Sequence, residues 1–357
     1  MDKNTWLFYK SALALHFDCH LEDCINGFTI TLANQRYYLR EGLSPFNIVS
    51  NVNVVSNKSC VNSLLQHAGL PVPKALAFTK QGFEENNVDF EDIQFPVVAK
   101  PTRGTSSGTD VFCNIPDKKT LFDYLKKMFL KHPVMSVEEF QSNLTSYRVL
   151  VFNNAVIGVV ERIPAHVIGD GIHTLHELIA ITNDQRKLLT EKMAVGPIEM
   201  GIEQQTKLSD MGMTLTDIPK KNERIQLCYK CNSAVGGTIR TADHEICKEN
   251  IALALRATKV INLDLVGFDI LCEDIGKPIG PTRGFIIEAN SNPDVSIHEL
   301  SMEGATNCVT RKILWGLVKR HPIAYFWMRI KKSSLKIYLR CALLIASFFL
   351  LKHFFKG

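Results

Sequence analysis

Hydrophobic and polar positions alternate along several short segments of the chain, as they do in half-buried strands. Residues 28–32 and 37–39 alternate on either side of a turn at 33–35, which predicts a hairpin. Residues 147–152 and 155–161 do the same around an Asn-Asn pair, which predicts a second hairpin.

Other segments repeat their apolar residues with helical spacing or as short continuous runs. Asn57 is a candidate helix cap, and Gly69 would end the helix that it begins. Further helices are expected at 117–131 and 245–261. Buried strands are expected at 95–100, 134–140, 265–272 and 284–289. Strands and helices of this kind predict an α+β fold.

The chain is long enough for two or three packed parts, and its polarity divides it into three segments. Residues 1–55 are predicted to form a small N-terminal α/β piece. Residues 56–310 would form the main domain, with a polar inserted lobe of helices and loops at 164–224. Residues 311–357 would form a basic linker and an apolar C-terminal helix.

The apolar C-terminal run has an uncharged core only from Cys341 to Leu351, which is short for a helix that crosses a bilayer. Basic residues precede it at 329–340. A tail anchor, an in-plane interfacial helix and a helix docked on the protein's own core all remain open. We expect membrane contact through residues 329–355.

Composition places the chain among ordinary globular proteins, with 46% hydrophobic and 22% charged residues. The net charge of +5 is modest, and no stripe of basic and aromatic residues indicates nucleic-acid binding. Ten cysteines are scattered, and residues 1–26 hold no apolar signal segment, so we expect a reduced, cytoplasmic setting. Cys228 and Cys231 form one CxxC with no second pair, which is a weak metal or redox signal.

Three oxygen-bearing side chains lie on two apolar strands. Asp269 is within one strand, and Glu288 and Asn290 end the next. Residues two apart on a strand project to the same face. Because Mg²⁺ prefers carboxylate and amide oxygens together with substrate phosphates, this set is a candidate magnesium site. The alternative is that the acids mark strand ends that face solvent.

A lysine and a loop of small residues follow another predicted strand. Lys100 would reach the edge of a sheet, and the loop from Gly104 to Gly108 comes next. Small residues let backbone N–H groups approach phosphate oxygens closely. The loop is neither a Walker loop nor a GxGxxG loop, so a flexible turn is the alternative.

Several motifs occur in the order typical of the ATP-grasp superfamily. The chain resembles that superfamily over about residues 36–305, and its nearest resemblance is to the ATP-grasp domain of cyanophycin synthetase and of bifunctional glutathione synthetases. The motifs are Asn57-Lys58-Ser-Cys, Pro96-Val-Val-Ala-Lys-Pro101, Val137-Glu-Glu-Phe140, Glu161-Arg-Ile-Pro-Ala-His-Val-Ile-Gly-Asp-Gly171, Gly236-Gly-Thr-Ile-Arg-Thr-Ala-Asp243, Gly267-Phe-Asp269 and Glu288-Ala-Asn290.

The resemblance implies an ATP-grasp fold, in which two α+β subdomains clasp ATP, and it implies roles for particular residues. The residues implied to bind ATP are Lys58, Lys100, Gly104, Ser106, Ser107, Gly108, Glu138 and Phe140. Those implied to hold Mg²⁺, with Mn²⁺ as an alternative, are Asp269, Glu288 and Asn290. Those implied to face phosphates or substrate carboxylates are Arg148, Arg162 and Arg240.

The implied function is an ATP-dependent ligase that joins an amino-acid or peptide carboxylate to an amine through an acyl phosphate. The alternative is a weakly catalytic ATP-binding protein at a membrane surface. Two departures from the family motivate it: residues 105–107 replace part of a richer loop, and residues 143–146 lack the acid that relatives often use for ribose. The pattern names neither substrate, and a dimer is one expected oligomeric form.

Overall fold

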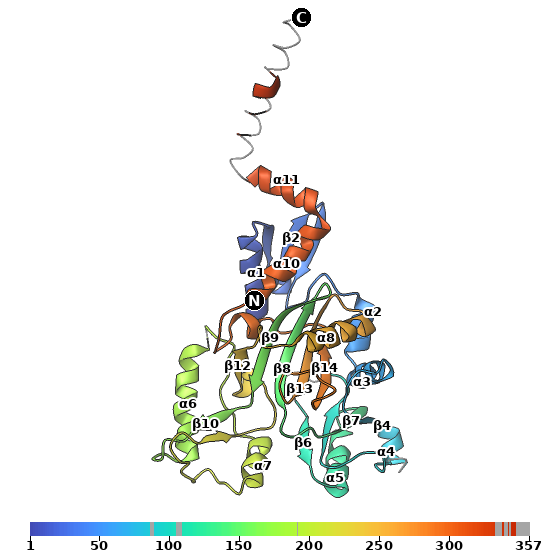
Figure 1. Cartoon of the computed structure of the whole chain (residues 1–357), viewed down its shortest axis with the longest axis vertical. Helices are drawn as coiled ribbons and strands as arrows, with labels where there is room; N and C mark the ends of the chain where they lie inside the picture. Colours follow the sequence, from blue (N-terminus) through green and yellow to red (C-terminus); the bar gives the residue numbers. More distant parts are fainter. Residues whose placement is uncertain are drawn as a thin grey trace, which may run out of the picture. The chain divides into compact units, whose positions relative to one another are not determined.

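The computed structural model describes residues 1–85, 89–104, 109–190, 192–332, 338, 342 and 344–347. The chain forms two compact units (Figure 1). One unit combines Met1–Pro45 with Thr310–Gly357, and the other is Phe46–Val309. The division into three segments made from the sequence stays a prediction.

The first unit contains an antiparallel sheet in the order β1-β2-β3. β1 is Asp18–Glu22, β2 is Gly27–Leu32 and β3 is Gln35–Leu39. The β2–β3 pair is the predicted hairpin, and Ala33 and Asn34 turn between the strands with positive φ.

The named helices of the first unit, among the described residues, are α1 (Lys3–Ala14), α10 (Val309–Arg320) and α11 (Pro322–Lys332). Ser11 and Thr310 share a hydrogen bond of 2.7 Å, which joins α1 to α10 although 299 positions separate them. The helices near the C-terminus therefore belong to the same unit as the first strands.

The second unit is built on a five-stranded antiparallel sheet in the order β12-β9-β8-β13-β14. The predicted hairpin around the Asn-Asn pair is formed by β8 and β9, which are neighbouring strands in the middle of this sheet. The strands are β8 (Thr145–Phe152), β9 (Ala155–Ile163), β12 (Thr238–Thr241), β13 (Leu265–Cys272) and β14 (Gly284–Asn290).

Alternation along these strands gives the sheet two different faces. Helices α3 (Lys58–His67) and α8 (Lys248–Ile261) pack against one face, where Val149 and Phe268 are fully buried. The neighbouring positions, such as Arg148, point to the opposite face. Asn57 caps α3 as predicted, because its side chain accepts from two backbone N–H groups.

A four-stranded antiparallel sheet in the order β4-β7-β5-β6 forms a second layer of this unit. Its core faces helices α4 and α5 and contains residues such as Val97, Ala99 and Val137. The elements are β4 (Ala75–Thr79), α4 (Lys80–Glu84), β5 (Val97–Pro101), β6 (Phe112–Ile115), α5 (Lys118–Met128) and β7 (Val134–Glu139).

The predicted inserted lobe has its own small core. It contains the predicted helices, and it also contains an antiparallel ribbon that the sequence did not reveal. The elements within residues 164–224 are β10 (His166–Ile168), α6 (Leu175–Leu189) and α7 (Ile202–Asp210). The second strand of the ribbon, β11 (Arg224–Gln226), begins at the last residue of the predicted lobe, and the 3₁₀ turn η2 (Ser233–Val235) follows it. Among the described residues, the other elements are η1 (Asp23–Ile25), α2 (Val49–Val55) and α9 (Ser296–Glu299).

The predicted C-terminal apolar helix falls mostly outside the described residues. Residues 338, 342 and 344–347 are described, and they are helical. No helix in the described part of the chain is long and apolar enough to cross a membrane.

Candidate active site

A cavity of about 970 Å³ opens between the polar faces of the two sheets of the second unit. The five-stranded sheet contributes Arg148, Asp269 and Glu288, and the four-stranded sheet contributes Lys100 and Glu138. The same alternation that buries apolar side chains against the helices therefore directs charged side chains into the space between the sheets.

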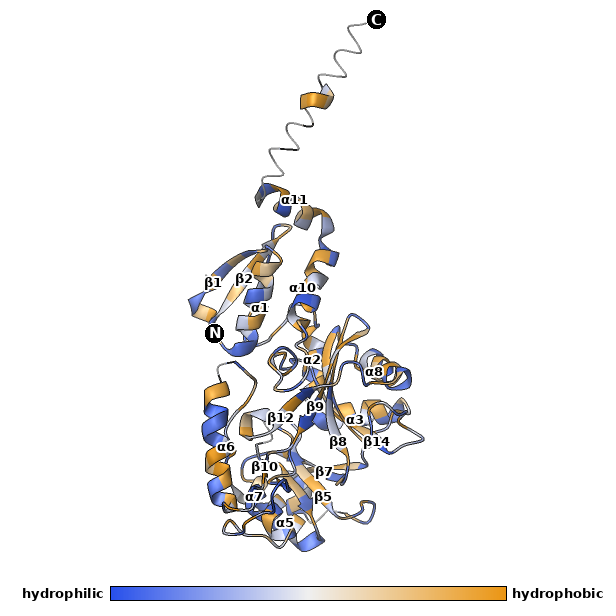
Figure 2. Cartoon of the chain, turned by 60° about the vertical axis from the view of Figure 1, so that its left-hand side comes forward, coloured by the Kyte–Doolittle hydropathy of each residue, from blue (hydrophilic) through white to orange (hydrophobic). Residues whose placement is uncertain are grey.

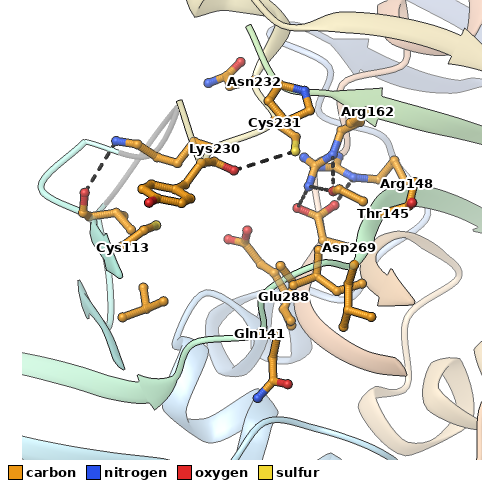
Figure 3. A pocket seen from close by; sticks show the side chains of 18 of the residues that line it. Cys113, Gln141, Thr145, Arg148, Arg162, Lys230, Cys231, Asn232, Asp269 and Glu288 are labelled. Carbon is orange, nitrogen blue, oxygen red and sulfur yellow. Dashed lines mark hydrogen bonds and ion pairs between the residues drawn. The ribbon is translucent and has the colours of Figure 1, made fainter. Parts of the chain in front are cut away.

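Asp269 forms ion pairs with two arginines in the cavity (Figure 3). Arg148 bonds one carboxylate oxygen through Nε, and Arg162 Nη2 lies 2.8 Å from the other. Arg148 is the direct neighbour of Asp269 across the β8–β13 pair. Burial alone would raise the pKa of Asp269, but the two guanidinium groups outweigh burial and lower it. Asp269 is therefore held as a carboxylate.

Glu288 faces Asp269 across the next pair of strands. Its Oε1 lies 3.2 Å from Nζ of Lys58, the first residue of α3. Asn290 is two residues further along β14 and also lines the cavity, with its side-chain N–H₂ 3.4 Å from the carbonyl oxygen of Gly267. The three candidate metal ligands are thus gathered on adjacent strands.

The oxygen atoms of this group fit a magnesium ion. The set offers two carboxylates and one amide, and each carboxylate has more lone pairs than its present contacts use. Among the described residues, no cluster of three His, Cys, Asp or Glu side chains could hold a metal ion. Mg²⁺ does not need a cage made only of protein ligands. It usually binds through one or two carboxylates together with substrate phosphates.

Lys100 and Glu138 form a second buried ion pair, on adjacent strands of the four-stranded sheet. Nζ of Lys100 lies 2.8 Å from Oε1 of Glu138, and both side chains are about nine-tenths buried. Burial would lower the pKa of Lys100, but Glu138, with a smaller contribution from Glu288, raises it. Lys100 therefore stays protonated beside the cavity.

Phe140 follows β7 at the junction of the two sheets. Its backbone N–H donates to the carbonyl oxygen of Pro96 at 2.9 Å, and its ring meets the ring of Tyr229 edge-on at 5.4 Å. Lys207 Nζ lies 4.4 Å from the centre of the Tyr229 ring. Phe140, Tyr229 and Lys207 all line the cavity.

Polar contacts join the inserted lobe to the four-stranded sheet at one side of the cavity. The hydroxyl of Tyr229 donates to Asp210 at the end of α7 and accepts from Asn114 of β6 at 3.0 Å. Lys230 pairs with Glu203 at 2.8 Å and also contacts the carbonyl oxygen of Val111 at 3.4 Å.

The ribbon of the lobe directs further polar side chains to the cavity. His166 and Gln226 are direct partners in the β10–β11 pair, and Arg224 lies on the same face. Nδ1 of His166 contacts the carbonyl oxygen of Pro164 at 2.9 Å, which leaves Nε2 to accept from Arg224 at 3.1 Å. Burial lowers the pKa of His166, and the charge of Arg224 lowers it further. The contact with Pro164 acts in the opposite direction but does not outweigh them.

Not every predicted site residue reaches the cavity. Arg240 is not among the residues that line it; its Nε donates to Glu161 at 2.7 Å, and it also pairs with Glu245. Gly104 is described, with a φ of 73°, but it does not line the cavity either. Ser106, Ser107 and Gly108 lie outside the described residues.

Sequence reasoning missed several cavity residues, above all Lys207, Tyr229, Lys230, His166 and Arg224. All belong to the inserted lobe or to the segment after it. Their signal in the sequence was weak, because they lie on short elements without a recognisable spacing. The available indications were the motif from Glu161 to Gly171, which contains His166, and Lys230 within the CxxC pair.

The cysteines near the cavity are protonated thiols. Burial raises the pKa of Cys113 to about 12, of Cys228 to about 12 and of Cys231 to about 11. The nine described cysteines are free, so the CxxC pair forms no disulfide.

Comparison with known proteins identifies relatives for most of the chain. No protein-family model matches it. It is 31% identical over 277 residues to a cyanophycin synthetase of Crocosphaera subtropica, which covers 76% of this chain and 31% of the relative. It is 28% identical over 272 residues to a bifunctional glutathione biosynthesis protein of Mannheimia succiniciproducens, covering 73% of this chain and 35% of the relative.

A solved structure extends the comparison to the fold. The crystal structure of a bifunctional glutathione synthetase from Pasteurella multocida superposes with a TM-score of 0.62 at 24% identity, over 90% of this chain and 44% of that chain. The chain spans about a third of the length of the curated relatives that it matches.

Proposed function

Because the chain has the ATP-grasp fold and is related in sequence to cyanophycin synthetases and bifunctional glutathione synthetases, we propose that it is an ATP-dependent ligase that joins a carboxylate to an amine. The observation that carries the proposal is the pairing of Asp269 and Glu288 across two strands, with Lys58, Arg148 and Arg162 in contact with them. Phosphoryl transfer needs such a concentration of oxygen ligands and cations.

The proposed reaction has two steps. A carboxylate oxygen of the substrate bonds to the γ-phosphorus of ATP, the bond from that phosphorus to ADP breaks, and an acyl phosphate forms. The amine nitrogen then bonds to the acyl carbon, phosphate leaves with the electrons of the carbon–oxygen bond, and the nitrogen loses a proton. The products are an amide, ADP and phosphate.

The chain's own residues would bind and orient the reactants. Lys58 and Lys100 would hold phosphate oxygens as point charges, and Phe140 would contact adenine at the hinge of the fold; all three line the cavity. Arg148 and Arg162 present planar guanidinium groups, which suit acyl phosphate and carboxylate oxygens.

Asp269, Glu288 and Asn290 would hold Mg²⁺ or Mn²⁺. The ion would supply charge neutralisation for the transferring phosphoryl group. For Arg240 the contacts favour a positioning role, because its partner Glu161 lines the cavity while Arg240 itself does not.

An assay of ADP release tests the function. We expect release to depend on ATP, Mg²⁺, a carboxylate and an amine together, across a panel of amino acids and short peptides. Glu288→Ala should abolish the Mg²⁺-dependent rate, whereas Glu249→Ala, which removes an exposed acid of α8, should keep it. Equal rates for wild type and Glu288→Ala would remove the metal assignment.

The second candidate, a weakly catalytic ATP-binding protein at a membrane surface, predicts a different result. That protein would bind ATP but release no ADP with any member of the panel. Basic and aromatic residues of the first unit favour a membrane contact, although they do not disfavour catalysis. A dimer and a reduced, cytoplasmic setting are also proposed; the nine free cysteines in the described part of the chain support the latter.

A further inference from the structure

Helix α11 presents three large apolar side chains to solvent. Ile323 is 73% exposed, Phe326 57% and Trp327 56%. These positions are spaced i, i+3 and i+4, so they lie on one face of the helix. Figure 2 shows hydrophobic and hydrophilic residues in turn along α11. An exposed group of this kind indicates an interaction surface rather than a solvated face.

The exposed face has a fixed orientation, because Tyr325 holds the helix from the other side. The Tyr325 hydroxyl donates to the carbonyl oxygen of Leu15 at 2.8 Å, and its ring meets Phe17 edge-on at 5.4 Å. The three apolar side chains therefore point away from the unit that α11 belongs to.

The segment that carries this face has charges of a single sign. Residues 310–357 contain eleven lysines and arginines and no aspartate or glutamate. On α10, the exposed residues Arg311, Lys312 and Lys319 surround Trp315, which is 44% exposed. A partner that covers these helices therefore has to be anionic and has to accept apolar side chains.

We propose that α11, together with the basic face of α10, docks in the plane of an anionic lipid surface. Ile323, Phe326 and Trp327 enter the boundary between headgroups and acyl chains, where amphipathic aromatic rings are favoured. The neighbouring lysines and arginines contact lipid phosphates. In this proposal α11 lies in the plane of the membrane surface, because its 11 residues are too few to cross a bilayer. This surface goes beyond the proposed ligase activity and does not depend on it.

Vesicle sedimentation with the full chain tests the proposal. We expect binding to vesicles of phosphatidylcholine with about a third phosphatidylserine, and much weaker binding to phosphatidylcholine alone. Binding should weaken as salt is added, because salt screens the attraction between the basic residues and the lipid phosphates. Equal binding to both kinds of vesicle would contradict the charge requirement.

Matched variants locate the surface. Phe326→Ser with Trp327→Ser should weaken binding at least about tenfold, because the buried apolar area is lost. Leu130→Ser with Leu188→Ser removes two exposed leucines of the second unit (82% and 81% exposed) and should leave binding unchanged. Lys331→Gln should weaken binding roughly fivefold, the effect of one cation near an anionic surface.

The vesicle binding and the oligomeric state of the α11 variant distinguish lipid docking from other uses of this face. If the α11 variant binds anionic vesicles as wild type does, another segment makes the contact and the proposal fails. If the variant instead abolishes a dimer seen by light scattering while vesicle binding persists, the face is an interface between copies of the chain. An unchanged thermal unfolding midpoint with lost vesicle binding would support the proposal, because it excludes misfolding as the cause.

Discussion

At the scale of single residues, the cavity is lined by pairs of oppositely charged side chains that are buried from water. Lys100 and Glu138 lie 2.8 Å apart with both side chains about nine-tenths buried. A buried pair contributes little net stability, but the loss of one partner is costly because the other charge is left without compensation. Substitutions of Lys100 and Glu138 can therefore separate the effect of this pair on stability from its effect on activity.

Lys100→Met should lower ADP release about a hundredfold, the usual effect of one lost electrostatic contact to a transition state. It should also destabilise the protein by about 3–5 kcal/mol, because Glu138 stays buried and unpaired. Adding Glu138→Met should restore much of the unfolding free energy in urea but not the activity. Recovery of activity in the double variant would contradict a contact between Lys100 and phosphate.

Cys113 lines the cavity, and its thiol should react slowly with iodoacetamide. Burial raises its pKa to about 12, so about one thiol in ten thousand is ionised at pH 8. The thiolate is the reactive form, and its fraction grows about tenfold for each unit that the pH rises towards that pKa. Mass spectrometry of labelled peptides, with the exposed Cys24 as the internal reference, measures the ratio. Equal labelling of the two residues at pH 8 would contradict the raised pKa.

At the scale of elements, the sequence was sufficient where a pattern is local. The hairpin of β8 and β9 could be predicted because its turn residues, Asn153 and Asn154, accept the positive φ values that a tight turn requires. The ribbon of β10 and β11 could not, because its strands have three residues each and meet only through the fold. A short strand offers too few positions to show alternation.

The same limit applies to the site. Asp269, Glu288 and Asn290 could be grouped from the sequence because they lie on long apolar strands, in which alternation shows the face to which each side chain points. Arg240 was expected at the reacting groups, yet it lies opposite Glu161 in the pairing of β12 with β9. That pairing joins distant segments and leaves no mark in the local pattern.

Gly196 tests how closely the inserted lobe packs against η2, which follows it in the sequence. A Cβ at this position would lie 2.0 Å from the carbonyl oxygen of Ala234 in η2. Gly196→Ala should therefore lower the unfolding free energy by about 2–3 kcal/mol, because the backbone of η2 has to move. Gly201→Ala, where the nearest atom is a flexible side-chain oxygen at 3.4 Å, should cost less than about 1 kcal/mol. Equal urea midpoints for the two variants would contradict the close approach.

At the scale of the whole molecule, the inserted lobe and the segment after it contact the four-stranded sheet of the second unit across the cavity. Tyr229, Asp210 and Asn114 connect α7 and the segment after β11 to β6. Contacts of this kind are few and polar, so they separate more readily than a packed core does. We therefore expect the lobe to separate from the four-stranded sheet more readily than the packed parts of this unit separate from one another.

Tyr229→Phe removes the hydroxyl contacts and keeps the ring beside Phe140. We expect the lobe to open about fivefold more often, which corresponds to the loss of about 1 kcal/mol for a hydrogen bond. Limited proteolysis between residues 201 and 235 should accelerate by the same factor, while the global unfolding midpoint changes little. Unchanged proteolysis would show that these contacts do not restrain the lobe.

The ion pairs of the cavity have a consequence for how the protein selects its ligands. Each lysine that we propose to hold a phosphate already has an acid beside it: Glu288 beside Lys58, and Glu138 beside Lys100. A phosphate group that takes Lys58 deprives Glu288 of its counter-charge, unless a divalent cation reaches that carboxylate together with the phosphate. By thermodynamic linkage, nucleotide and metal then raise each other's affinity by the same factor. On the proposed assignment, the cavity should therefore bind a metal–nucleotide complex more tightly than it binds a phosphate or a divalent cation alone.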